Sequence, residues 1–129
     1  MSTSGEREPG EMERNNGAKQ LVILISGRWT LAVLDLLTDR GRRYQDLHDA
    51  LDGIAYKALT DTLRRAERDG LINRRLDPGS IETATLYELT ELGRSLDASL
   101  EAMAEWAIAD WQSVEMARRH WDQLRRASG

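Results

Sequence analysis

Apolar positions along the chain recur at helical spacing in several segments and alternate with polar positions in two others. Between residues 44 and 69, two helical patterns are separated by Gly53. Two strand patterns follow at residues 71–76 and 83–89, around a turn at residues 77–80 that has Pro and Gly in its middle places. The order helix, turn, helix, strand, turn, strand is typical of a winged helix-turn-helix.

Helical patterns also flank this central part. One begins near Ala18, a second covers about residues 28–38, and residues 91–126 have a helical pattern almost throughout. A continuous helix of about 36 residues would be on the order of 54 Å long, which exceeds a compact body of this size. We therefore expect either a break near Gln112 and Ser113 or a helix that projects into a partner.

Charge and composition narrow the ligand classes. The whole chain has a net charge of −4, but residues 40–75 hold nine basic and six acidic residues. The binding of a polyanion depends on the local charge of the binding surface rather than on the total charge of the protein. The sequence therefore predicts a basic face on an otherwise acidic protein. The chain has no cysteine, which excludes disulfides and thiol redox sensing and fits a cytoplasmic protein.

The second helix of the central pair presents a polar face that suits double-stranded DNA. Burial of Leu59, Leu63 and Ala66 on one side of residues 55–69 turns the other side outward. In helix-turn-helix docking, such a face enters the major groove and contacts base edges. A solvated helix face is the plainer interpretation. The candidate DNA-binding side chains of this helix are Tyr56, Lys57, Thr60, Asp61 and Arg64.

Four arginines flank this helix in positions suited to phosphates. Two precede the first helix of the pair and two stand on the first wing strand, and both places commonly contact the DNA backbone. Asp77 and Glu82 near the wing tip would be repelled by phosphates, so the tip itself is not expected to touch DNA. Simple surface solubility is the alternative for the arginines. The four are Arg42, Arg43, Arg74 and Arg75.

These elements predict a mainly helical α+β fold. Residues 17–126 are expected to form a single winged helix-turn-helix domain with a two-stranded β wing. Within it, residues 28–95 would be the DNA-binding core, and residues 17–25 and 96–126 would be dimerisation helices. Residues 1–16 are rich in Ser, Gly, Glu and Arg and lack an apolar period, so they predict a disordered N-terminal arm.

Three of the four tryptophans fall in the last helical region: Trp106, Trp111 and Trp121. Large aromatic side chains on terminal helices suit a homodimer interface, which we favour. They could instead line a pocket for a flat ligand. For an effector, the sequence predicts a noncovalent apolar or aromatic small molecule, bound near Trp29, Met103, Trp106 and Trp111.

Signals for an enzyme, a cofactor or a membrane are weak. His48 and His120 are isolated, and no Cys or His stands at ligand spacing, so no metal site is expected. The chain has no nucleophile elbow and no Gly-rich phosphate loop. No apolar run approaches the roughly 20 residues that a membrane span needs.

Several short motifs, each weak alone, together resemble one family. They are GRWT at 27–30 before an apolar helix, RYQDL at 43–47, GI at 53–54, KALT at 57–60, DGLI at 69–72 and YELTELG at 87–93. Over roughly residues 17–106 this joint pattern resembles the HxlR-type transcriptional regulators. The resemblance implies a bacterial or archaeal winged-helix repressor or activator that binds a palindromic operator as a homodimer, often near its own gene.

The resemblance also assigns roles to positions. Lys57, Thr60 and Arg64 match the family's DNA-facing residues, and Arg43 matches a phosphate contact. Ala55 stands where a Ser helix cap is common, which weakens that helix start by about 1 kcal/mol. Asp61 stands where Gln is common, although an aspartate can accept a hydrogen bond from a cytosine amine. Relatives that sense electrophiles use an N-terminal Cys, so a signal for this chain would be noncovalent.

Two other functions stay open on the sequence alone. The same winged fold could bind a protein partner without binding DNA. An enzyme with a Trp-lined pocket ranks lower, because no acid–base pair or nucleophile is placed. The dependence of binding affinity on salt concentration distinguishes a protein partner from DNA. Affinity for DNA falls steeply as the salt concentration rises, because phosphate contacts release counterions.

Overall fold

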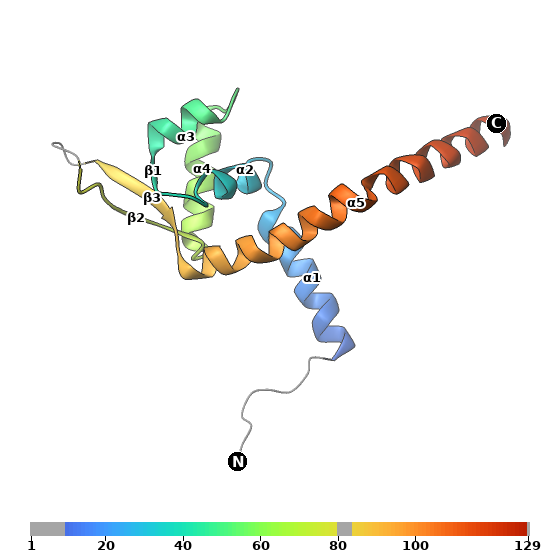
Figure 1. Ribbon diagram of the computed structural model, residues 1–129, viewed down its shortest axis with the longest axis horizontal. Helices are drawn as coiled ribbons and strands as arrows, with labels where there is room; N and C mark the ends of the chain where they lie inside the picture. Colours follow the sequence, from blue (N-terminus) through green and yellow to red (C-terminus); the bar gives the residue numbers. More distant parts are fainter. Residues whose placement is uncertain (1–9, 80–83, 129) are drawn as a thin grey trace, which may run out of the picture.

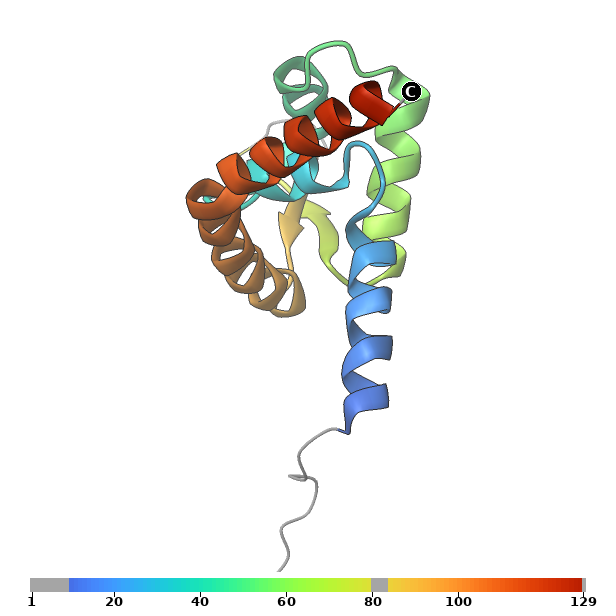
Figure 2. The same ribbon diagram turned by 90° about the vertical axis from the view of Figure 1, so that its right-hand side faces the viewer.

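The computed structural model describes residues 10–79 and 84–128 (Figure 1). A bundle of three short helices packs beside a small sheet, and two further helices extend from this body (Figures 1 and 2). The elements in chain order are α1 (Glu11–Ile25), α2 (Thr30–Leu36), β1 (Arg42–Arg43), α3 (Tyr44–Ala50), α4 (Tyr56–Arg68), β2 (Ile72–Leu76), β3 (Thr85–Leu89) and α5 (Glu91–Ser128).

The core lies where α2, α3 and α4 meet the sheet. On α4, Leu59, Leu63 and Ala66 are buried as the sequence predicts, and each buried leucine contributes about 1.5–3 kcal/mol relative to exposure. The winged helix-turn-helix is therefore confirmed. The largest fully buried side chains are Leu37, Leu47, Leu59, Ile72 and Val33.

The sheet has one strand more than the predicted wing. The strand order is β1-β3-β2, with both pairings antiparallel. Arg42 lies opposite Tyr87, and Ile72 lies opposite Leu89. The two-residue strand β1 is too short to show alternation, so the sequence pattern does not predict it.

Helix α1 starts earlier than the sequence predicts. The predicted disordered arm, residues 1–16, is helical from Glu11 onward, and residues 1–9 lie outside the described part of the chain. Glu11 and Glu13 in the first turn suit the positive end of the helix dipole. No residue of α1 is buried in the single chain. A helix that buries nothing needs no apolar period, so the pattern gave no signal before Ala18.

Helix α5 is continuous over 38 residues, about 57 Å at the standard rise. The expected alternative of a break near Gln112 and Ser113 is wrong, and the projecting helix is observed. Its second half leaves the body and extends away from the other elements (Figure 1). The tryptophans of α5 are consequently exposed, with Trp106 at 56% and Trp111 at 44% of their surface.

Candidate nucleic-acid interface

Helix α4 turns its polar side away from the core. Its N-cap, Ala55, makes no side-chain capping hydrogen bond, as expected for an alanine at that position. Tyr56, Lys57 and Arg64 are exposed, and Lys57 reaches 87% exposure of its side chain. The other two sequence-predicted positions on this helix, Thr60 and Asp61, are half-buried.

Two tyrosines fix α3 against the start of α4. The Tyr44 hydroxyl donates to the Tyr56 carbonyl oxygen at 3.0 Å, which leaves Thr60 Oγ1 to donate to Tyr44 Oη at 2.8 Å. The Tyr56 ring stacks on the ring of His48 from α3, with 3.8 Å between ring centroids. The Thr60 hydroxyl is therefore engaged inside the fold. Helical periodicity gave no signal for Tyr44 or His48, because these contacts join two helices.

Lys57 and Asp61 form an ion pair one helical turn apart on the exposed face. Lys57 Nζ lies 2.7 Å from Asp61 Oδ2. The hydrogen bond from Lys57 holds the pKa of Asp61 below its ordinary value. Asp61 therefore stays ionised near neutral pH and can only accept hydrogen bonds.

Arg43 ties the start of α3 to the wing turn. Its guanidinium donates to Asp77 Oδ2 from Nη2 at 2.6 Å and from Nε at 3.0 Å. The Arg43 hydrogen bonds, together with the Gly79 N–H, lower the pKa of Asp77. The wing carboxylate expected to repel phosphates is thus already neutralised by an arginine. Glu82 lies outside the described residues.

The two wing arginines are also paired. Arg74 Nε lies 3.1 Å from Glu67 Oε1 on α4, and Arg75 Nε lies 2.8 Å from Glu88 Oε2 on β3. Exposed pairs of this kind contribute about 0–1 kcal/mol each. A phosphate can therefore replace either carboxylate at small cost.

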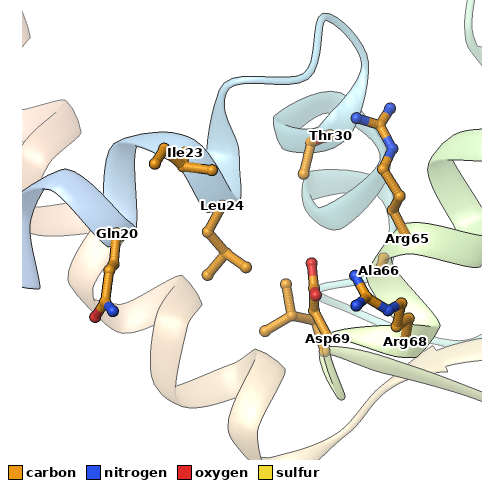
Figure 3. A pocket seen from close by; sticks show the side chains of 9 residues that line it. Gln20, Ile23, Leu24, Thr30, Arg65, Ala66, Arg68 and Asp69 are labelled. Atoms are coloured by element: carbon orange, nitrogen blue, oxygen red, sulfur yellow. The ribbon is translucent and has the colours of Figure 1, made fainter.

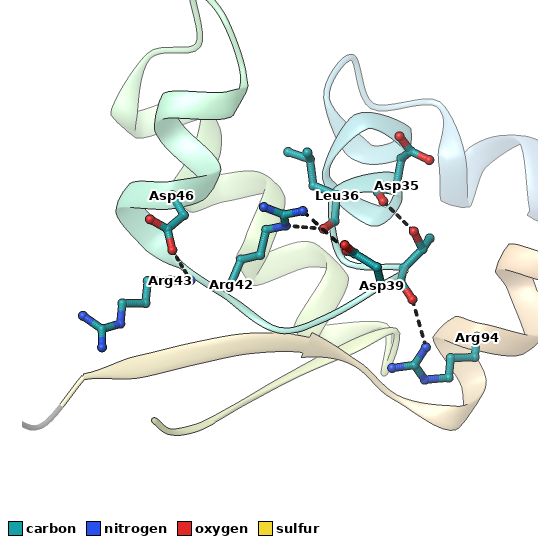
Figure 4. Close-up of polar contacts among 8 residues, drawn as sticks. Asp35, Leu36, Asp39, Arg42, Arg43, Asp46 and Arg94 are labelled. Atoms are coloured by element: carbon teal, nitrogen blue, oxygen red, sulfur yellow. Dashed lines mark hydrogen bonds and ion pairs between the residues drawn. The ribbon is translucent and has the colours of Figure 1, made fainter. Parts of the chain in front are cut away.

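The sequence predicts that Arg42 faces outward toward phosphates, but in the structure its side chain folds back onto the end of α2. Its Nε donates to the Leu36 carbonyl oxygen at 2.6 Å, and its Nη2 lies 3.4 Å from Asp39 (Figure 4). Nearby, Arg94 Nη1 donates to the Thr38 carbonyl oxygen at 3.2 Å (Figure 4). The end of α2 leaves carbonyl groups without helical partners, and these guanidiniums satisfy two carbonyl oxygens there. Arg42 thus has a structural role.

Arg64 is different from the other basic candidates. It is exposed and makes no hydrogen bond or ion pair with any residue in the described ranges. It lines a crevice with Tyr44, Thr60 and Tyr87, between α4 and the sheet. Arg64 is accordingly available to a ligand without the loss of an internal pair among those residues.

The four residues predicted for an effector pocket do not come together in one chain. Met103 lines an open groove between α2 and α5, and Trp106 and Trp111 lie farther along α5, outside its lining. Trp29 is half-buried and packs against the core. Within one chain, α5 runs past α2 and carries its tryptophans away from Trp29, so the effector pocket stays a prediction.

A second crevice, of about 340 Å³, lies between α1, α2 and the end of α4 (Figure 3). Its lining includes Leu24 and Leu71 as well as Arg65 and Arg68. None of the predicted effector residues lines it. Its position shows that Arg65 and Arg68 stand on another side of α4 from Lys57 and Arg64.

The described residues hold no group of three or more side chains suited to a metal ion. Among the helices in that same part of the chain, none combines the length and apolar character needed to cross a bilayer.

Comparison with known proteins gives a consistent result. The family model described as HxlR-like helix-turn-helix matches residues 24–115. The HTH-type transcriptional regulator YtcD of Bacillus subtilis, itself uncharacterized, is 36% identical over 83 residues, which is 64% of this chain and 65% of YtcD. The chain thus spans slightly less than two thirds of that relative. The similarly named sll1512 of Synechocystis is 37% identical over 97 residues, 75% of this chain and 70% of the relative.

Among solved structures, a protein from Enterococcus faecalis V583, described as a transcriptional regulator of the MarR family, superposes with a TM-score of 0.73 at 29% identity. The match covers 85% of this chain and 96% of that one. These similar proteins are all named as regulators of transcription rather than as enzymes.

Proposed function

The chain belongs to the HxlR-like helix-turn-helix family, and from this premise we propose that it regulates transcription as a homodimer bound to a palindromic operator. Helix α4 enters the major groove of each half-site. The observation that carries the proposal is the exposed face of α4, on which Arg64, beside Lys57 and Tyr56, makes no hydrogen bond or ion pair with the described residues.

Each basic side chain has a role that follows from its surroundings. Arg64 donates two hydrogen bonds to a guanine edge. Lys57 contacts a base or a phosphate after leaving Asp61, and the freed Asp61 accepts from a cytosine amine. Arg43 exchanges Asp77 for a phosphate. The wing arginines, Arg74 and Arg75, exchange their carboxylates in the same way.

The replacement of a carboxylate by a phosphate lowers the affinity for DNA that each arginine contributes, but it does not abolish that affinity. A phosphate gains a charge-assisted hydrogen bond, and the carboxylate that it replaces returns to water at the surface. The net gain per contact is small, so affinity is built from several contacts and stays moderate. Arg42 is left out of this set because its guanidinium is hydrogen-bonded to the Leu36 carbonyl oxygen.

The proposal is tested by footprinting on the DNA upstream of the chain's own gene. The expected result is a protected palindrome whose half-sites lie about 10 base pairs apart, or a multiple of this spacing. Protection of a single half-site would contradict the homodimer. Absence of protection here and on a random-sequence library would contradict operator binding.

Salt dependence is a second expected result. Because the contacts of Arg43, Arg74 and Arg75 would release counterions from DNA, operator affinity should fall about tenfold or more between 50 and 200 mM salt. Fluorescence anisotropy of a labelled operator measures this slope. A protein-interaction module held by apolar contacts would bind its partner with little change over the same range.

The proposal also includes regulation by an aromatic small molecule that binds noncovalently in the groove beside Met103. Its support is the apolar groove lined by Met103, Leu31, Leu34 and Leu100. A ligand bound there is expected to change tryptophan emission, because Trp106 follows Met103 on the same helix. Titration with a panel of aromatic compounds measures this change. Emission that stays constant across the panel would argue against an aromatic effector.

A further inference from the structure

The groove beside Met103 is acidic as well as apolar. Its lining comes from the end of α1, from α2 and from the first half of α5, and its volume is about 410 Å³. No basic residue belongs to this lining among the residues described. The charged residues of this acidic groove are Asp35, Asp97 and Glu101.

One face of α5 continues from the acidic groove to the end of the helix. Positions spaced alternately three and four residues apart stay on one side of a helix, as in the seam of a coiled coil. From Asp97 this spacing leads through Ala104, Trp111 and Trp121 to Arg125. Trp121 is 58% exposed. The seam thus combines small side chains in its first half with tryptophans and arginines in its second, and nothing among the described residues covers that second half.

The charges of α5 are divided between its two halves. Residues 91–115 include six acidic residues and one basic residue, whereas residues 116–128 include four arginines and one aspartate. Arg118 lies over the Trp111 ring at 5.2 Å, and Arg125 lies over the Trp121 ring at 4.9 Å. Two of the arginines in the second half of α5 therefore stack on exposed tryptophan rings. The family match ends at residue 115, so this basic end lies beyond it.

We propose that the basic end of α5, residues 116–128, docks in the acidic groove of a second copy of this chain, with the two α5 helices antiparallel. This inference rests on the proposed homodimer and specifies its register. The midpoint between Asp97 and Arg125 is residue 111, so the twofold axis passes near Trp111. Each end of the pair then brings Arg118 and Arg125 to the groove carboxylates.

Size and charge both favour this occupant. Trp121 reaches the apolar floor beside Ala104, where a small side chain leaves room for the indole ring. The chain cannot fill its own groove, because α5 is continuous and Trp121 lies about 30 Å along the helix from Glu101. A parallel pair would place like charges beside one another along the whole seam. An aromatic effector in the groove would compete with Trp121 of the second copy.

The register is tested by charge reversal in the full-length chain. Arg118→Glu with Arg125→Glu, and separately Asp97→Lys with Glu101→Lys, should each weaken the dimer roughly tenfold at low salt, because like charges then meet at both ends. All four substitutions together restore opposite charges and should return the dissociation constant to nearly its original value. Sedimentation equilibrium measures each constant.

The matched control is Arg119→Glu with Arg126→Glu, which makes the same change of charge one position outside the seam and should leave the dimer unchanged. Equal weakening by this control, or no recovery in the fourfold variant, would overturn the docking. Double variants that dimerise like the original chain would overturn the register while leaving the homodimer and operator binding intact. An original chain that is monomeric when bound to its operator would instead refute the homodimer.

Discussion

Replacement of Arg64 by alanine is expected to weaken operator binding by about 1–3 kcal/mol, or roughly 5- to 150-fold, and to relax specificity at one base pair. The physical reason is that Arg64 is exposed and has no hydrogen bond or ion pair with the described residues. Its contribution to a guanine contact is therefore not offset by the loss of an internal pair. Anisotropy titrations with the operator and with single-base variants measure both effects.

The matched control for this substitution is Arg65→Ala. Arg65 is the next residue of α4 and carries the same charge, but it lines the crevice beside α1 rather than the groove-facing side (Figure 3). It should lose only the general attraction of one positive charge, with specificity unchanged. If the two variants bound every operator variant alike, Arg64 would not read a base and the docking of α4 would be wrong.

Replacement of Gly93 by alanine is expected to lower the stability of the fold by about 2–3 kcal/mol, with a fall in Tm of roughly 10 °C. A Cβ at Gly93 would clash with the Leu71 carbonyl oxygen and would lie 3.2 Å from Leu89 Cδ2. That carbonyl oxygen also accepts the Thr90 N–H at 3.0 Å, so neither backbone can move freely. Thermal and urea unfolding followed by circular dichroism measure the loss.

The control for Gly93 is Gly17→Ala. Gly17 also lies inside a helix, but a Cβ there meets nothing within 4 Å. Alanine favours a helix over glycine by about 1 kcal/mol, so this variant should be as stable as the original chain or more so. A Gly93 variant that unfolds at the same temperature as the Gly17 variant would show that α5 can shift on the Leu71 turn.

The elements of the fold could be predicted because each leaves a repeating local pattern. The buried stripe of Leu59, Leu63 and Ala66 defines α4 and also selects which of its side chains face outward. Gly93 interrupts the pattern of α5, and the Leu71 backbone lies where its side chain would be. The start of α1 could not be predicted, because its first turns, residues 11–17, bury nothing in the single chain and carry no apolar period.

The sequence predicted most of the residues of the candidate interface, but not the pairs that they form. Exposure of Lys57 and Arg64 follows from the helical period, whereas the carboxylate that pairs with Arg43 does not. Asp77 stands 34 residues away, and it meets Arg43 only because the wing turn folds back beside α3. Arg42 has the same residue type as Arg43 and is its neighbour, yet it is held by the Leu36 carbonyl oxygen.

The sequence by itself determined the helix-turn-helix, the wing strands and the outward face of α4. The reason is that periodicity and turn chemistry act over a few neighbouring residues. Only the tertiary structure decided which arginines pair with carboxylates distant in the sequence. It also decided that α5 continues without a break and that the tryptophans of α5 lie apart from Trp29. Such pairings depend on the relative placement of segments distant in the chain, which is fixed by the packing of the shared core and not by the local pattern of any one segment.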